Sequence, residues 1–314
     1  MPDHEIQLSL PFVLREVGSL MARVTILIIN KLLYTDAFSW KILIHLNSGN
    51  SGFSTEFEIF REIKSPRGLF WADPFVVEAT GRYYIFVEEY NYRKKKAHIS
   101  VLELDGNGSL QKHYPIISQR YHMSYPFVFK VEGCFYMIPE TAANNTIELY
   151  RCVRFPDKWE FDRIIMDGVS ATDTTLFYHV GKWWLFTTLD QTNNVSGGST
   201  ELFLYYSDDP LTGRWISHPL NPVVSDERSA RCAGKLFLHQ GTVYRPAQDC
   251  SMRYGRGISL KRVTIMSENE YHEVTETEIK PVWNRKLKGT HTFNFESGLT
   301  VIDTYTFHGR LAMI

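Results

Sequence analysis

The chain has 314 residues, of which 44% are hydrophobic and 14% aromatic, so it is long enough to bury a large core. Its formal net charge is −1, with acidic and basic residues interspersed. This balance excludes a protein that binds nucleic acid through a broad basic surface. The short basic run at residues 93–96 is interpreted as solvated surface.

Residues 10–34 (LPFVLREVGSLMARVTILIINKLLY) have the pattern of an amphipathic helix that is interrupted by Arg15, Glu16 and Arg23. The uninterrupted apolar part is too short to span a bilayer, and it lacks the basic start and cleavage site of a secretion signal. We therefore expect residues 1–39 to form a helical extension packed on the main domain, without a transmembrane segment, in a cytoplasmic protein. Contact with a membrane surface is the minor alternative.

Five similar hairpin patterns follow along the rest of the chain. The first, FWADPFVVEATGRYYIFVEEY at residues 70–90, has two aromatic and β-branched runs on either side of Gly81. The pattern recurs at intervals of roughly 50 to 60 residues, the length of a propeller blade, and two more strand-like runs follow each of the first four hairpins. The later hairpins are centred on Gly133, Gly181, Gly241 and Gly298.

The fifth hairpin has no following pair of strand-like runs in this sequence. Two such runs stand instead before the first hairpin, at residues 40–46 and 56–63. If these runs complete the last blade, the ring closes and no sheet edge is left free. The sequence therefore predicts an all-β, five-bladed β-propeller, formed by residues 40–314 as a single domain.

The four cysteines fall into two pairs that could face each other across adjacent strands. Cys232 and Cys250 lie symmetrically about the turn at Gly241, and Cys134 and Cys152 lie symmetrically about an intervening loop. Cysteine is also a common small buried residue, and no secretion signal indicates an oxidising compartment. We therefore favour four free thiols over disulfides.

Polar and ionisable residues gather where the hairpins begin and end. In a propeller the first strand of each blade lines the central channel, and its start lies beside the end of the second strand. Counting from the turn glycines places Asp73 opposite Glu88 and Asp173 opposite Thr188. The expected residues of this channel mouth are Asp73, Glu88, Tyr125, Glu140, Asp173, Arg231, Gln248, Asp249, His291 and Asp303.

Each of these residues taken singly has an ordinary structural explanation, because acidic residues at strand ends commonly cap turns or pair with arginine. Their convergence is harder to explain in that way. Like charges held together in a concave site shift one another's pKa, which acid–base chemistry requires. The channel mouth of a propeller is also the default location for a ligand pocket.

Two stretches resemble known enzymes. ADPFVVEATGRYYIFVEE is similar to the first blade of the five-bladed, furanosidase-type glycoside hydrolases of families 43, 32 and 68, and ATDTTLFYHVGKWWLFTT is similar to their third blade. The resemblance implies that Asp73 is the general base or nucleophile and that Asp173 orients the sugar and tunes the acid. In the fourth blade, where these hydrolases carry a general-acid glutamate, the chain has Arg231 and Cys232 in SARCAGKLF.

A narrower resemblance is carried by RCAGKLF, YRPAQDCSMRYGRGISL, SYPFVF and YMIPET. These segments resemble the N-terminal propeller region of plant glucosamine inositolphosphorylceramide transferases and of related bacterial proteins from surface-polysaccharide clusters. The resemblance covers roughly residues 70–310. It implies a role with glycans and leaves open whether the propeller is catalytic.

Two functional hypotheses remain. The favoured one is a furanosidase-like glycoside hydrolase in which Asp73 is the base, Asp173 the modulator and Glu140 the replacement acid, beside Tyr125 and without a countercharge. The alternative is a non-catalytic sugar-binding propeller that serves a glycosyltransferase or a polysaccharide biosynthesis system. Only a hydrolase requires a second carboxyl group at catalytic separation.

In the binding hypothesis tyrosines stack on sugar rings, with Tyr83, Tyr125 and Tyr254 as candidates. In either hypothesis Arg231 and Arg245 can clamp an acidic sugar or a phosphate. No cofactor and no metal are expected, because dinucleotide-binding, P-loop and metal-ligand motifs are absent and a calcium ion in the channel has no loop motif in its favour. The partners expected are a carbohydrate and, in the alternative, a glycosyltransferase. The residues expected to bind substrate are Glu88, Tyr125, Arg231, Arg245, Gln248, Asp249, Tyr254, His291 and Asp303.

Overall fold

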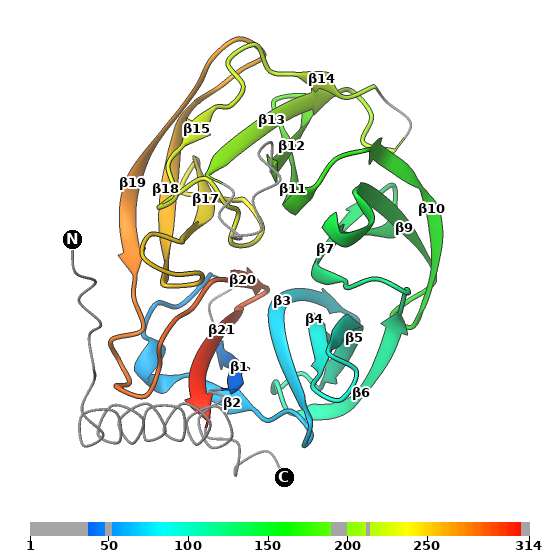
Figure 1. Ribbon diagram of the computed structural model, residues 1–314, viewed down its shortest axis with the longest axis vertical. Helices are drawn as coiled ribbons and strands as arrows, with labels where there is room; N and C mark the ends of the chain where they lie inside the picture. Colours follow the sequence, from blue (N-terminus) through cyan, green and yellow to red (C-terminus); the bar gives the residue numbers. More distant parts are fainter. Residues whose placement is uncertain (1–36, 48–51, 190–199, 212–213, 309–314) are drawn as a thin grey trace, which may run out of the picture. The chain divides into compact units, whose positions relative to one another are not determined.

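The computed structural model describes residues 37–47, 52–189, 200–211 and 214–308. Residues 40–306 form one compact body, in which five antiparallel sheets are arranged as blades around a common centre (Figure 1). The prediction of an all-β, five-bladed propeller is therefore confirmed. Almost all of the helical extension expected at residues 1–39 lies outside the described residues. Within the part of the chain that is described, no helix is long and apolar enough to cross a membrane.

Blades 1 and 2 are regular four-stranded sheets whose strands follow one another in the chain. Blade 1 consists of β3 (Leu69–Ala79), β4 (Arg82–Asn91), β5 (Lys96–Leu104) and β6 (Leu110–Ile117). Blade 2 consists of β7 (Ser124–Val131), β8 (Cys134–Thr141), β9 (Thr146–Arg154) and β10 (Lys158–Asp167), with the 3₁₀ turn η2 (Ala142–Asn144) between β8 and β9.

Blades 3 and 4 keep the same order but have shorter strands at one position each. Blade 3 consists of β11 (Ala171–His179), β12 (Lys182–Leu189) and β13 (Glu201–Ser207), with β14 (Ile216–Ser217) and β15 (Val224–Ser225) both paired to β13. Blade 4 consists of β16 (Phe237–His239), β17 (Thr242–Asp249), β18 (Gly257–Met266) and β19 (Tyr271–Ile279).

Blade 5 joins the two ends of the propeller sequence. Its strand order is β2 (Arg61–Ile63), β1 (Ala37–Leu46), β21 (Leu299–His308) and β20 (Phe293–Glu296). The predicted closure of the ring by N-terminal strands is therefore correct. The run at residues 56–63 was expected to be one strand, but it divides into the 3₁₀ turn η1 (Phe57–Ile59) and the short β2.

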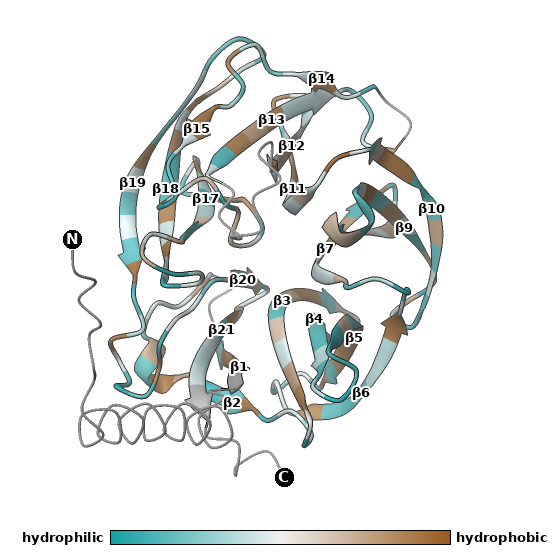
Figure 2. Ribbon diagram, viewed as in Figure 1, coloured by the Kyte–Doolittle hydropathy of each residue, from teal (hydrophilic) through white to brown (hydrophobic). Residues whose placement is uncertain are grey.

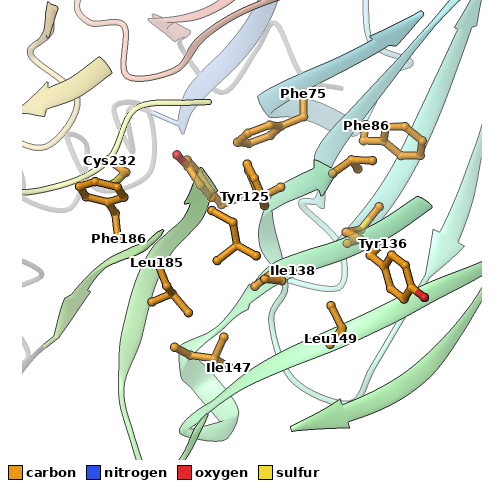
Figure 3. Packing of buried hydrophobic residues seen from close by; sticks show 14 of the residues in the cluster. Phe75, Phe86, Tyr125, Tyr136, Ile138, Ile147, Leu149, Leu185, Phe186 and Cys232 are labelled. Carbon is orange, nitrogen blue, oxygen red and sulfur yellow. The ribbon is translucent and has the colours of Figure 1, made fainter. Parts of the chain in front are cut away.

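Large side chains fill the spaces between the blades. Phe75 and Phe86 of blade 1 share one buried cluster with Tyr125 and Ile138 of blade 2, and the rings of Phe75 and Tyr125 are 4.8 Å apart (Figure 3). The outer strand β19 is mostly hydrophilic, because one of its faces meets solvent (Figure 2). The apolar side chains of the inner strands therefore hold neighbouring blades together.

All five inner hairpins turn in the same way. In each, both central residues have positive φ, which defines the type I′ turn that matches the twist of the flanking strands. Glycine occupies the second position every time, and this recurrence produced the repeat seen in the sequence. The pairs are Thr80–Gly81, Glu132–Gly133, Val180–Gly181, Gln240–Gly241 and Ser297–Gly298.

Replacing Val180 by asparagine is expected to stabilise the protein. Val180 is 81% exposed and has a φ of 48°, a left-handed conformation that costs a β-branched residue about 1 kcal/mol or more and that asparagine tolerates. Chemical denaturation should show a gain of about 1 kcal/mol in the free energy of unfolding. The same substitution at Val153, an exposed strand residue, is the control, and an equal gain there would contradict this explanation.

The predicted cross-strand pairs at the channel mouth were wrong by one residue. Asp73 and Asp173 sit in β-bulges with φ of 50° and 52°, so their preceding residues, Ala72 and Thr172, lie opposite Glu88 and Thr188. A third bulge at Tyr125 shifts the pairing of Glu140 in the same way, to Ser124. Counting residues from the turn glycine cannot reveal a bulge, because the count assumes an unbroken ladder.

Candidate functional site

The bulges in blades 1 and 3 place two carboxylates at equivalent positions of the ring. A β-bulge redirects a side chain, and the left-handed backbone at Asp73 and Asp173 is a strained conformation of the kind that concentrates at functional sites. Both residues are almost completely buried. These two carboxylates form the base of the site, and more accessible groups lie above them.

Asp73 is surrounded by hydrogen-bond donors from blades 2 and 5. Its Oδ2 accepts the backbone N–H of Tyr125 at 3.1 Å, and its Oδ1 accepts the hydroxyl of Thr292 at 3.0 Å. The Nε2 atom of His291 lies 3.2 Å from the same Oδ1. Burial is the main cause that raises the pKa of Asp73 to about 7, and His291 only partly offsets it.

His291 is held between two carboxylates. Its Nδ1 lies 2.6 Å from Oδ2 of Asp303, whose other oxygen accepts the backbone N–H groups of His291 and Thr292. Burial opposes a charge on the imidazole, but Asp303 and Asp73 outweigh it and raise the pKa of His291 to about 9. His291 is therefore a cation at neutral pH, stacked on Trp40 at 3.9 Å.

Arg231 bridges the second pair of carboxylates. Its Nε donates to Oδ2 of Asp173, and its Nη2 lies 3.5 Å from Oε2 of Glu140. The same Asp173 oxygen accepts Nε2 of Gln248 at 2.7 Å, and Glu140 accepts the backbone N–H of Asp173 at 3.2 Å. Burial and the neighbouring Asp173 raise the pKa of Glu140 to about 8, despite Arg231.

A raised pKa of Glu140 was expected from the sequence, but the reason given for it was wrong. The expectation placed Glu140 beside Tyr125 without a countercharge, whereas the structure places Arg231 next to it. The pKa rises because desolvation and Asp173 together exceed the effect of the guanidinium.

The upper layer of the site contains the accessible groups. Tyr254 is 44% exposed and lies over the guanidinium of Arg231, with 5.0 Å between Cζ and the ring centre. Its ring also meets Trp40 and His291 edge to face, at 6.3 and 5.2 Å. Tyr254 thus offers an exposed aromatic surface above the buried charges.

Glu88 and Asp249 lie at the edges of this arrangement. Glu88 Oε1 is 3.3 Å from Nε2 of His122; burial opposes the charged imidazole, but Glu88 outweighs it and raises the pKa of His122. Asp249 accepts the backbone N–H of Ser251 at 3.0 Å and lies 3.4 Å from Nη1 of Arg256. Asp249 therefore stabilises the loop that carries Tyr254.

Three residues expected to contact substrate have other roles. Arg245 is completely buried and donates two hydrogen bonds to Glu273, at 2.8 and 2.6 Å, so it is a structural residue of blade 4. Tyr125 is also completely buried, and its hydroxyl bonds Thr175 at 3.0 Å. Tyr83 donates to the backbone of the turn in blade 5, at the opposite end of its hairpin. None of the three offers a ring face or a free charge to a ligand.

Several residues of the site were not predicted from the sequence. Trp40, Thr292 and His122 all contact its charged groups, yet none belongs to the hairpin positions that were counted. Gly234 was also missed: its N–H donates to the Tyr125 hydroxyl at 2.8 Å, and a Cβ there would lie 2.1 Å from the carbonyl oxygen of Phe293. Gly234 lies in RCAGKLF, one of the segments that carry the family resemblance, and this was the feature of the sequence that could have identified it.

Among the described residues, Asp73, His291 and Asp303 bring ligand atoms within 4.8 Å of one another, the spacing that a metal ion would need. Each imidazole nitrogen already faces one of the two carboxylates. A metal ion bound here would have to displace His291 from one of these carboxylates. The three residues therefore fit a closed network of ion pairs better than a metal centre. The four cysteines are all free, as favoured from sequence.

The five-bladed propeller is a fold that this chain shares with solved glycoside hydrolases. A family 117 glycoside hydrolase from Zobellia galactanivorans superposes with a TM-score of 0.53 at 12% identity, covering 85% of this chain and 91% of that one. The α-L-arabinofuranosidase of Podospora anserina, solved with cellotriose, gives a TM-score of 0.52 at 10% identity, covering 76% and 92%. At such low identities these likenesses show the fold alone.

Sequence comparison identifies the family. Residues 61–300 match the family described as "Glucosamine inositolphosphorylceramide transferase 1, N-terminal", and the chain belongs to it. The rice protein of that name is 35% identical over 208 residues, which cover 65% of this chain and 28% of the rice protein. The Arabidopsis thaliana protein is 32% identical over 228 residues, covering 72% and 29%. The match thus spans less than a third of the length of these relatives.

Proposed function

We propose that this propeller is a glycan-binding domain that serves a glycosyl transfer reaction and holds a sugar at the channel mouth. The observation that carries the proposal is the closed environment of Asp73. Asp73 is 4% exposed, and its carboxylate already contacts a backbone N–H, a hydroxyl and an imidazole. A catalytic base must reach a water or a sugar directly, and this carboxylate has little capacity left for either.

The accessible groups suit recognition of a sugar. Tyr254 supplies an aromatic face, while Glu88, Glu140 and Arg231 have side chains with 11%, 15% and 12% exposure at its base. Aromatic stacking together with a few polar groups is the usual composition of a small-molecule site. The relatives named as transferases carry this domain in a longer chain, which supports a role beside a transferase.

Glycoside hydrolysis is the second candidate, and the raised pKa of Glu140 favours it. A carboxyl group that is protonated at neutral pH can donate a proton to a leaving group. In this version Glu140 is the acid and Asp73 or Asp173 the second carboxylate. The same protonated group can also donate a hydrogen bond to a bound sugar, so it fits both functions.

Titration calorimetry with a panel of furanosides, pyranosides, amino sugars and acidic sugars tests the proposal. Tyr254→Ala is expected to weaken binding of the recognised sugar about tenfold, while Tyr254→Phe retains it because the ring face remains. Tyr178→Ala, at another exposed tyrosine on the turn side of blade 3, is the matched control. Binding that survives Tyr254→Ala would place the sugar elsewhere.

The same samples distinguish a binder from an enzyme. If the proposal is correct, the sugar is recovered unchanged after prolonged incubation with the wild-type protein. Release of a reducing sugar that disappears in Glu140→Gln and Asp73→Asn, with the fold intact, would replace the binding function by hydrolysis.

A further inference from the structure

A groove of about 310 Å³ lies on blade 5, away from the groups of the channel mouth. Its walls come from β1, η1, β2, β21 and the segment at residues 283–287. The volume is at the lower end of the range of small-molecule pockets, which suits a ligand of monosaccharide size.

One wall of the groove is aromatic. The ring of Phe57 stacks on the indole of Trp283 with 4.7 Å between centres and an interplanar angle of 30°, and Phe60 lies 5.1 Å from Phe57. An aromatic wall of this kind suits a ligand with an apolar face.

Apart from Leu43 and Leu287, the rest of the lining is polar, and its charges balance. Lys41 forms an ion pair with Glu62 at 3.0 Å, and the other two charged residues of the lining, Lys286 and Glu58, are also of opposite sign. With two cations and two anions, the groove selects neither sign of ligand. A neutral ligand fits it best.

Two residues of the lining have buried polar atoms without a hydrogen-bond partner among the described residues. They are the Nε1 of Trp283 and the Oγ1 of Thr304, and Thr304 is completely buried. A buried donor or hydroxyl without a partner costs free energy, so such groups call for an explanation. A ligand hydroxyl seated in the groove would supply the missing partner.

The groove is separated from the channel mouth by the strand β21. Asp303 and Thr304 are consecutive residues of that strand, so their side chains point to opposite faces. Asp303 contacts His291 of the candidate site, whereas Thr304 lines the groove. The two sites therefore lie on opposite faces of one strand.

We propose that this groove is a second carbohydrate subsite, which binds a neutral sugar unit with its apolar face against the aromatic wall. Hydroxyl groups on the rim of the sugar pair with Trp283 and Thr304. This inference rests on the proposed function, because it assigns a further unit of the glycan to the same domain. An apolar segment of a protein is the competing occupant, and its side chains would leave both polar atoms unpaired.

Calorimetry and tryptophan fluorescence with neutral methyl glycosides and their oligosaccharides test the subsite. Trp283→Phe keeps the aromatic wall but removes the N–H, and Thr304→Val removes the hydroxyl at nearly constant volume. Each is expected to weaken neutral-sugar binding by roughly three- to tenfold. Trp183→Phe, at a partly buried tryptophan of blade 3, is the matched control and is expected to change nothing.

The outcomes separate this proposal from the function of the mouth. Loss of one binding event in Trp283→Phe and of a different one in Tyr254→Ala supports two subsites. If binding is lost in Tyr254→Ala but unchanged in Trp283→Phe and Thr304→Val, the mouth binds sugar and the subsite is wrong. If no sugar of the panel binds, both proposals fall. Thr304→Val removes an unpaired group, so it is expected to fold, and thermal unfolding of each variant checks this.

Discussion

Replacing Glu273 by leucine is expected to lower the free energy of unfolding by about 3–5 kcal/mol, because it leaves the charge of Arg245 buried without its partner. Arg245 is completely buried, and both of its hydrogen bonds to a carboxylate go to Glu273. Burial alone would raise the pKa of Glu273, but Arg245 outweighs it and lowers that pKa. Urea denaturation at neutral pH measures the loss.

The double variant Arg245→Met/Glu273→Leu is the control for this effect. Removing both charges together avoids the uncompensated ion, so most of the stability should return. Nη1 of Arg245 has no partner among the described groups, which means that the native pair is itself incompletely satisfied. A loss of less than about 1 kcal/mol in Glu273→Leu would show that water or a rearrangement reaches the guanidinium.

Replacing Glu140 by glutamine is expected to stabilise the protein at alkaline pH and to have little effect at low pH. The pKa of Glu140 is raised from 4.5 to about 8 by burial and by Asp173. The native state therefore binds this proton more tightly than the unfolded chain, and wild-type stability falls as the pH rises from about 4.5 to about 8. Glutamine does not titrate, so the stability of the variant should not decrease over this pH range for this reason.

At pH 9 the gain should reach about 2–4 kcal/mol, and below pH 4.5 it should vanish. Thermal unfolding across this pH range measures the difference between variant and wild type. Glu160→Gln, at an exposed carboxylate of β10, is the control and should show no such trend. A gain that does not depend on pH would mean that Glu140 is ionised in the native protein. The destabilisation caused by Glu140 would then have a cause other than its raised pKa.

The fold could be predicted from the sequence because its signal is repeated. A glycine at the second position of each type I′ turn marks all five hairpins, and the strand runs before the first hairpin indicated how the ring closes. The bulges at Asp73, Tyr125 and Asp173 could not be predicted, because no residue type requires them. The turns depend on glycine, whereas the bulges depend on tertiary contacts.

The sequence predicted which residues belong to the candidate site better than it predicted what each of them does there. Glu140, Asp173 and Arg231 do lie together, and Asp73 is near enough to raise the pKa of Glu140. The contacts between these side chains could not be predicted from the sequence, because they depend on how residues of different blades are placed around the channel. Arg245 shows the limit most clearly: it is on the same strand as Gln248 but bonds outward to Glu273 on β19.

The closure of the ring in blade 5 has a consequence for synthesis of the chain. Strand β1 is the first of the described propeller strands to be made but pairs with β21, the last of them, so the two are separated by the synthesis of blades 1 to 4. Blades 1 to 4 can pair as they emerge, because their strands are neighbours in sequence. Strand β2 can pair with one edge of β1 early, but the other edge, beside the apolar residues Ile42 and Ile44, stays unpaired until the ribosome has passed residue 300. A nascent chain that stalls within blade 4 therefore presents an open ring and a half-formed blade 5, with one edge of β1 unpaired, to the cell's chaperones.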